Sequence, residues 1–257
     1  MPARNMVGAV DRTEFHKLFN ATGPVVLPVI HVLDTGRTLA NIDVLIRAGA
    51  AGCFLINHDF GMDGLPPILR DVRAQHPELW MGCNFLGVTG KNAFPVLGEL
   101  QTDGCRVDAY WADDACIDET KRNPAEADEI SGARAISGWK GLYFGGTAFK
   151  KQREVAPEHY EAAARIAATR MDVVTTSGIA TGKEADLSKI QDFRRGIGDT
   201  PLALASGITP ENAGAYRDVD AFMVATGINY PGNFYDIDPD RLDALMAITR
   251  DLGAANG

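Results

Sequence analysis

Eight short apolar segments alternate with longer segments of helical pattern along most of this chain, and this alternation restricts the fold more than any other feature. The short segments are rich in β-branched and aromatic residues, whereas the longer ones are rich in alanine and leucine. Alternation of this kind is typical of βα units around a parallel sheet. The predicted strands are Val25–Val32, Gly52–Ile56, Trp80–Phe85, Arg106–Trp111, Gly141–Gly145, Val173–Thr176, Leu202–Ala205 and Ala221–Val224.

Predicted helices fill the intervals between these strands. The clearest is Leu65–Gln75, in which apolar residues recur at spacings of three and four. A short leading helix is expected after the segment Asp11–Glu14, which resembles a capping box. The other predicted helices are Leu39–Ala48, Ala93–Thr102, Ala125–Ile136, Pro157–Thr169, Leu187–Ile197, Pro210–Arg217 and Asp240–Leu252.

The length of 257 residues matches one (β/α)8 barrel, which takes about 250 residues. Hydrophobic residues make up 46% of the chain and charged residues 23%, which is enough for a large core. No linker or low-complexity tract divides the sequence. We therefore predict an α/β protein with a single (β/α)8 TIM-barrel domain over residues 1–257, in which residues 1–23 form an N-terminal helical extension.

Charge and hydropathy restrict the partners of the protein. A net charge of −9 argues against broad nucleic-acid binding, which relies on basic surface. No apolar run reaches the roughly 18 residues of a membrane span, and Met1–Asn5 lacks the apolar core of a signal peptide. We expect a cytoplasmic protein whose partner is a small molecule, and a homo-oligomer is compatible with these features.

Each of the last two predicted strands ends at a small hydroxyl residue followed by glycine. In a parallel barrel, the loops after these strands often form a phosphate pocket, where glycine lets the anion approach backbone N–H groups. Glycine also ends many strands simply because turns require it. The occurrence of two such ends favours phosphate binding by Ser206, Gly207, Thr226 and Gly227. A small phosphorylated metabolite is the expected ligand.

Three residues near other strand ends are candidates for catalysis. His31 interrupts an apolar strand, where an imidazole needs either a role such as acid–base chemistry or a hydrogen bond to a core carbonyl. Asp59 is the second acid–base candidate, with a loop-capping aspartate as the alternative. Lys150 is the third, as an ammonium donor, proton-transfer group or Schiff-base nucleophile. Its neighbours Lys151 and Arg153 favour a solvated basic loop as the alternative.

Four polar residues are predicted to contact the substrate. Asn57 and Asn84 stand at the ends of the second and third predicted strands, where an amide could orient a hydroxyl or carbonyl group. Thr176 and Ser177 begin a loop rich in glycine and threonine after the sixth strand. The alternatives are amides bonded to neighbouring strand ends and an ordinary βα turn.

No cofactor is predicted from the sequence, although an oxygen-rich Mg²⁺ site is compatible with it. Asp59 together with Asp34 or Asp113 would supply suitable oxygen ligands. Their spacing is not specific to a metal, so no metal ligand is predicted. The polar segment Ala112–Pro124 after the fourth strand is either an element of the site or a solvated loop.

Three segments carry a recognisable pattern: Val29-Ile30-His31-Val32, Gly82-Cys83-Asn84-Phe85-Leu86 and the stretch from Thr181 to Asn212, which ends in Ser-Gly-Ile-Thr-Pro-Glu-Asn. These segments resemble the BtpA/SgcQ family, whose name is tied to photosystem I biogenesis and whose reaction is poorly defined. The resemblance covers the chain from about Pro24 to Leu252 and implies a TIM-type barrel of the ribulose-phosphate-binding kind.

Three departures from the family pattern indicate a divergent member. Val32–Gly36 replaces a proline-rich stretch after the first histidine. Glycine stands at Gly145-Gly146, where the resemblance implies an acidic residue on strand five. Asn229 stands where it implies a basic residue after the last Thr-Gly.

These observations predict an enzyme, an isomerase, lyase or transferase, that binds a phosphorylated sugar or nucleotide-like molecule. Its chemistry would be acid–base isomerisation or bond cleavage. The alternative is a non-catalytic assembly or regulatory factor of the BtpA type. That alternative predicts an exposed apolar patch and a pocket without convergent polar groups.

Overall fold

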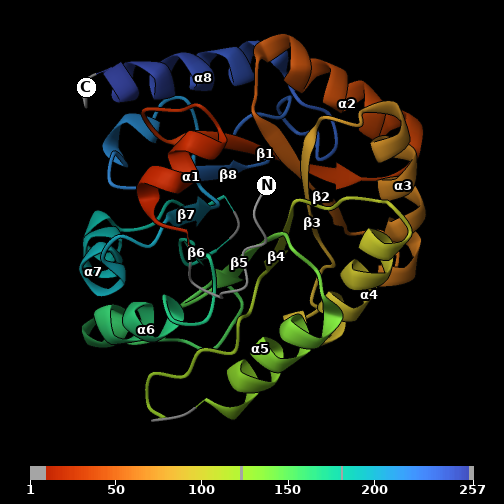
Figure 1. Ribbon diagram of the computed structural model, residues 1–257. Helices are drawn as coiled ribbons and strands as arrows, with labels where there is room; N and C mark the ends of the chain where they lie inside the picture. The colour runs from red at the N-terminus through yellow and green to blue at the C-terminus, as the bar shows by residue number, and fades with distance from the viewer. Residues whose placement is uncertain (1–9, 122–123, 181, 255–257) are drawn as a thin grey trace.

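Eight parallel strands form a closed barrel in the computed structural model, which describes residues 10–121, 124–180 and 182–254 (Figure 1). Each strand pairs with the next along the chain, and the last closes against the first between Val25↔Ala221 and Pro28↔Val224. The predicted fold class is therefore confirmed. The strands are β1 (Val25–Val32), β2 (Gly52–Asn57), β3 (Trp80–Asn84), β4 (Ala109–Ala112), β5 (Leu142–Gly146), β6 (Val173–Thr176), β7 (Leu202–Ala205) and β8 (Ala221–Val224).

Helices form an outer ring around this barrel (Figure 1). They are α2 (Thr35–Ala48), α3 (Leu65–Gln75), α4 (Gly90–Thr102), α5 (Ala125–Ser137), α6 (Tyr160–Ala167), α7 (Leu187–Ile197) and α8 (Pro239–Ala254), with 3-10 turns η1 (Met62–Gly64), η2 (Pro157–His159) and η3 (Ala213–Ala215). The predicted helix Pro210–Arg217 is wrong, because only η3 forms there. The Asn212 side chain accepts from Thr209 N at 2.9 Å and donates to Gly207 O at 2.7 Å, which holds the segment in a turn.

Helix α1 (Arg12–Leu18) lies across the amino-terminal end of the barrel (Figure 1). The Asp11 carboxylate caps it by accepting from Glu14 N at 2.7 Å, as the capping-box pattern predicts. Phe15 is fully buried, and its ring centroid lies 6.2 Å from that of Phe144 on β5. Residues 1–9 of the predicted extension lie outside the described part of the chain.

Asp220 ties α1 and α7 to the start of β8. Its side chain is fully buried and accepts hydrogen bonds from Arg12 Nε at 2.8 Å and Arg194 Nη2 at 2.6 Å. It also accepts from the Leu202 backbone N–H of β7 at 2.8 Å. The amino-terminal end of the barrel is thus held by a buried ionic network as well as by apolar packing.

Alternate residues of each strand point into the barrel and outward to the helices. Val29 and Ile56 belong to the inner apolar cluster, whereas Ile30 and Leu55 belong to the outer one. Both sides of the strands are apolar, as expected of a covered parallel sheet. The same alternation continues past the strand ends and decides which polar side chains reach the open end of the barrel.

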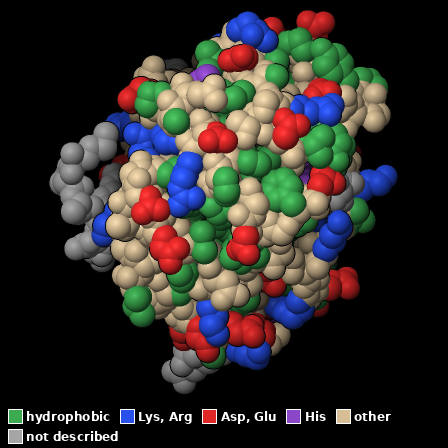
Figure 2. Space-filling model, turned by 90° about the vertical axis from the view of Figure 1, so that its right-hand side faces the viewer, with side chains coloured by type: hydrophobic (Ala, Val, Ile, Leu, Met, Phe, Trp, Pro, Cys, Tyr) green, Lys and Arg blue, Asp and Glu red, His purple; other side chains and the backbone are tan. Residues whose placement is uncertain are grey.

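Acidic and basic side chains are interspersed among apolar ones on the face that Figure 2 shows, without a broad basic patch among the described residues of that face. No helix in the described ranges has both the length and the apolar character required to cross a bilayer.

Candidate functional site

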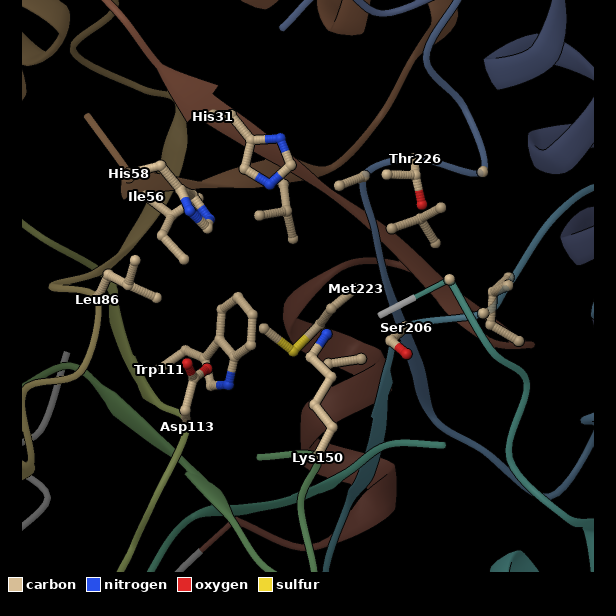
Figure 3. A pocket seen from close by; sticks show the side chains of 18 of the residues that line it. His31, Ile56, His58, Leu86, Trp111, Asp113, Lys150, Ser206, Met223 and Thr226 are labelled. Carbon is tan, nitrogen blue, oxygen red and sulfur yellow. The ribbon is translucent and has the colours of Figure 1, made fainter. Parts of the chain in front are cut away.

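A pocket opens where the strands end at their carboxyl side (Figure 3). Apolar side chains such as Ile56, Leu86 and Met223 form part of its wall, and titratable groups enter between them. Six predicted site residues line it: His31, Lys150, Ser206, Gly207, Thr226 and Gly227.

The His31 side chain is held in one tautomer. Its Nδ1 lies 2.8 Å from Phe234 O, and because a carbonyl oxygen only accepts, Nδ1 carries the proton. The His31 and Phe234 rings stack with their centroids 3.8 Å apart, and the His58 ring meets the His31 ring edge-on at a centroid distance of 4.8 Å. Burial lowers the pKa of His31 from 6.5 to about 4, although the bond to Phe234 opposes it. Near neutral pH, His31 is therefore an uncharged group whose Nε2 accepts a hydrogen bond.

This lowered pKa predicts that the protein loses stability in mild acid. Between the unfolded pKa of 6.5 and the folded pKa of about 4, the unfolded chain binds a proton at His31 and the folded chain does not. The free energy of unfolding should therefore fall by about 2 kcal/mol between about pH 7 and pH 4.5 through this residue. In urea unfolding, the decrease in the free energy of unfolding over this pH range should be smaller for His31→Gln than for the wild type by that amount.

His159→Gln is the matched control, because His159 is exposed at the amino-terminal cap of α6 and does not line the pocket. An equal dependence on pH in the wild type and in His31→Gln would contradict the buried neutral state of His31.

The loop between β8 and α8 supplies the carbonyl that holds His31. Asn229 Nδ2 donates to the same Phe234 O at 3.0 Å, and Asn41 Nδ2 of α2 donates to Tyr235 O at 2.8 Å. Arg37 of α2 forms an ion pair with Asp236 in this loop. Asn229 stands where the resemblance implies a basic residue. It is buried, and its hydrogen bond stabilises the loop.

Asp113 and Lys150 enter the pocket from the loops after β4 and β5 (Figure 3). Asn84 Nδ2 donates to Asp113 Oδ1 at 3.1 Å and orients this carboxylate. Burial raises the pKa of Asp113, against the hydrogen bond from Asn84 and the charge of Lys150. Burial lowers the pKa of Lys150, against the charge of Asp113. These shifts bring the two proton affinities closer together, as acid–base chemistry requires.

The pocket carboxylate, Asp113, comes directly after β4, and β5 has no room for a side chain at the position that faces it. A Cβ at Gly146 would lie 1.9 Å from Asp113 O, so any side chain at this inward position would collide with the neighbouring backbone. Glycine on β5 therefore permits the close approach that places Asp113 in the pocket. The structure thus has glycine on strand five, where the resemblance implies an acidic residue, and a carboxylate at the end of the adjacent strand.

Thr176 and Ser177, predicted to contact substrate, are buried and do not line the pocket. Thr176 Oγ1 donates to Thr147 O at 3.0 Å and joins the ends of β5 and β6. Ser177 Oγ accepts from the backbone N of Lys150 at 2.8 Å. Ser177 thus positions the loop that carries Lys150.

Asn57 and Asp59 also lie outside the pocket lining. Asn57 Nδ2 donates to Phe60 O at 2.7 Å, and its Oδ1 accepts from Leu86 N at 3.1 Å, which joins the β2 and β3 loops. Asp59 accepts from the Tyr235 hydroxyl at 3.1 Å. Asn57 and Asp59 follow the outward-pointing side chains of β2 at a spacing of two residues, so they point away from the barrel interior.

The predicted phosphate segments face the pocket opposite the β2 and β3 loops (Figure 3). Gly207 has a φ of +76°, and a Cβ there would lie 2.3 Å from Lys183 O, so the turn requires glycine. The backbone N–H groups of Gly207, Ile208, Thr226 and Gly227 form no hydrogen bond with any described residue. Unpaired N–H groups gathered along a pocket wall suit an anion.

The carboxylates considered for Mg²⁺ do not converge. Asp34 caps α2 by accepting from Arg37 N at 2.8 Å, and Asp59 bonds to Tyr235, so only Asp113 of the three lines the pocket. Within the described ranges, no three His, Cys, Asp or Glu side chains gather as metal ligands would.

Four polar or aromatic lining residues were not predicted as catalytic or substrate-binding, although Asp113 was considered as a Mg²⁺ ligand: His58, Trp111, Asp113 and Phe234. His58 continues the inward phase of Phe54 and Ile56, and Asp113 follows Trp111 at the same spacing. The signal that could have found them is this period of two, counted from a residue known to point inward. Phe234 lies in a loop and carries no such signal.

No family model and no curated protein matches this sequence. Solved structures do match. Tryptophan synthase subunit alpha from Legionella pneumophila str. Paris has 16% identity, coverage of 96% of this chain and 100% of that one, and a TM-score of 0.62. Phosphoribosyl anthranilate isomerase from Thermus thermophilus has 14% identity, coverage of 89% and 99%, and a TM-score of 0.56. A structure described as native KDPGal has 12% identity, coverage of 88% and 95%, and a TM-score of 0.60. At these identities the similarity shows the fold, a TIM barrel.

Proposed function

We propose that this barrel is an enzyme that binds a small phosphorylated metabolite and transfers protons on it. The phosphate would lie against the backbone N–H groups of Gly207 and Gly227. Asp113 and Lys150 would exchange protons with the reacting end. The observation that carries the proposal is that one pocket contains both the unpaired N–H groups and a carboxylate and ammonium whose pKa values are shifted toward each other.

The other pocket residues take supporting roles in this proposal. Neutral His31 accepts a hydrogen bond from a substrate hydroxyl through Nε2. Trp111 forms part of the pocket wall and would pack against the ligand. The reaction class that fits these groups is isomerisation or bond cleavage assisted by acid and base.

A neighbour in structure supports the substrate class by analogy. The isomerase from Thermus thermophilus acts, by its name, on a phosphoribosyl compound. Because one fold serves many functions, this analogy supports the proposal without carrying it. A non-catalytic factor of the BtpA type predicts a pocket without convergent polar groups, and the convergence of His31, Asp113 and Lys150 favours the enzyme. Membership of the BtpA/SgcQ family stays a proposal.

The phosphate site predicts a thermal shift with inorganic phosphate. At about ten times its dissociation constant, phosphate should stabilise the protein by about 1.4 kcal/mol, which raises Tm by roughly 4 °C. Thr226→Asp should abolish the shift, because it places a negative charge on an exposed position beside the anion site. Differential scanning fluorimetry over a series of phosphate concentrations, at constant ionic strength, measures the shift in Tm of the wild type and of Thr226→Asp.

Thr13→Asp is the matched control, since Thr13 is exposed on α1 at the opposite end of the barrel. This variant should keep the full phosphate response. Equal responses in Thr226→Asp and Thr13→Asp would reject the site, as would the absence of any response in the wild type.

A further inference from the structure

Lys189 is buried and Lys150 is half-buried, and the two side chains differ in what their ammonium groups contact. Lys189 of α7 donates to Ala148 O at 2.6 Å and to Ser177 O at 2.8 Å, so it joins two loops. The Lys150 ammonium forms no hydrogen bond or ion pair with any described residue. Lys189 is therefore a structural tie, whereas Lys150 ends in the pocket with its nitrogen free.

The surroundings of Lys150 lower the proton affinity of its amine. Its Nζ lies 5.5 Å from the Phe149 ring centroid, and Figure 3 shows the side chain reaching toward Met223 and Trp111. An ammonium in such a place loses solvation without a partner at ion-pair distance, and burial accordingly lowers the pKa of Lys150. A lysine of this kind is a nucleophile toward carbonyl carbon.

We infer that Lys150 forms an imine with the carbonyl group of a phosphorylated aldehyde or ketone held in this pocket. The inference rests on the proposed function for the phosphate end of that substrate. Figure 3 places Ser206 and Thr226 on one side of the pocket and Asp113 on another, with Lys150 reaching between them. A ligand with its phosphate on the first side would present its carbonyl to Nζ and to Asp113.

The proton balance of the step needs only these two side chains. The Asp113 carboxylate takes one proton from the Lys150 ammonium, and the free amine attacks the carbonyl carbon while the oxygen recovers that proton. Asp113 then removes a second proton from nitrogen and returns it to the hydroxyl, which leaves as water. The nitrogen lone pair closes the C=N bond, so ammonium plus carbonyl gives iminium plus water, and Asp113 ends as a carboxylate.

Reductive trapping tests the inference. The full chain is incubated with dihydroxyacetone phosphate and sodium cyanoborohydride, which reduces an iminium to a stable secondary amine. We expect one adduct per chain, with the mass of the probe less water plus two hydrogens, mapped to Lys150 by peptide mass spectrometry. Labelling should need at least about tenfold less probe than with dihydroxyacetone, and inorganic phosphate should slow it.

Lys150→Arg and Lys150→Met should both lose the adduct, and circular dichroism shows whether each is folded. Lys151→Arg is the matched control, because Lys151 is the adjacent, more exposed lysine at the same pocket and arginine keeps its charge, and it should keep labelling at Lys150.

No adduct at Lys150, with the phosphate thermal shift intact, would overturn the imine and leave the proposed function standing. Equal labelling of Lys150, Lys151 and surface lysines would also overturn the imine. An adduct at Lys150 without any thermal shift would support the imine and remove the phosphate part of the proposed function.

Discussion

Replacing Asp113 by asparagine is expected to slow imine formation at Lys150 by roughly 100-fold. The amide keeps the size of the side chain and can still accept from Asn84 Nδ2, but it cannot take and return protons. A positioned acid–base group contributes about 10²- to 10⁴-fold to such steps. The measurement is the rate of adduct formation with dihydroxyacetone phosphate and cyanoborohydride, followed by intact mass spectrometry.

The same variant should change the pH dependence of labelling in a second, separate way. The charge of Asp113 raises the pKa of Lys150, so its removal should free the amine at lower pH. The rate should therefore reach a lower plateau, and its rise with pH should begin earlier. A purely structural role for Asp113 would not combine these two effects.

Asp114→Asn is the control for this prediction. Asp114 is the next carboxylate along the chain, and its Oδ1 accepts from Cys116 N at 2.7 Å without lining the pocket. Its substitution should leave both the plateau and the profile near those of the wild type. An Asp113→Asn variant with wild-type rate and profile would refute the proton-transfer role.

Asp220→Ala is expected to lower the free energy of unfolding by about 4 kcal/mol, the cost typical of breaking a buried ion pair by removing one partner. Arg194, with its side chain 18% exposed, would lose the carboxylate that compensates its charge. The buried Leu202 N–H would lose its acceptor as well. For a chain of this length, Tm should fall by roughly 10 °C, as measured by circular dichroism.

The contribution of Asp220 should disappear in acid. Burial on its own would raise the pKa of Asp220, but His16 Nε2, 3.2 Å from its Oδ1, and the charge of Arg194 outweigh it and hold this pKa well below its usual range. Stability from such a group is present above the unfolded pKa, near 4, and is lost as pH falls through the folded pKa. The gap between wild type and Asp220→Ala should therefore narrow below about pH 4.

Asp218→Ala is the matched substitution, because Asp218 is exposed and only its backbone carbonyl accepts from Arg194. It should change Tm little. A comparable loss in both variants would mean that the buried network does not hold this end of the barrel.

Most of the fold could be predicted because its signals are local. The strand β6 and the helices α3 and α7 begin and end at the predicted residues, since apolar periodicity and turn residues mark both ends. Pro210–Arg217 shows the limit of this reasoning. A proline after a threonine is a good local start for a helix, but the Asn212 side chain bonds to Thr209 and Gly207 and stabilises a turn instead.

The site was less predictable because each strand is apolar on both sides. Nothing in the sequence near β2 says whether Asn57 and Asp59 or His58 point inward, and the structure turns His58 to the pocket. The sequence is equally ambiguous about the side of β6 on which Thr176 lies, and the structure points this side chain outward. The positions of Ser206-Gly207 and Thr226-Gly227 were easier to predict, because both residues of each pair lie in the turn that follows the strand.

Local sequence patterns were enough to predict that eight βα units form a barrel and that Ser206-Gly207 and Thr226-Gly227 lie at one end of it. Hydrophobic periodicity and turn chemistry act between residues close in the chain, so they can be read without knowing the fold. Barrel closure brought Asp113 and Lys150 into one pocket, placed Gly146 against the Asp113 backbone and joined His31 to Phe234. Burial and charge set the proton affinities of these groups, and both depend on residues from distant segments that meet only when the barrel closes.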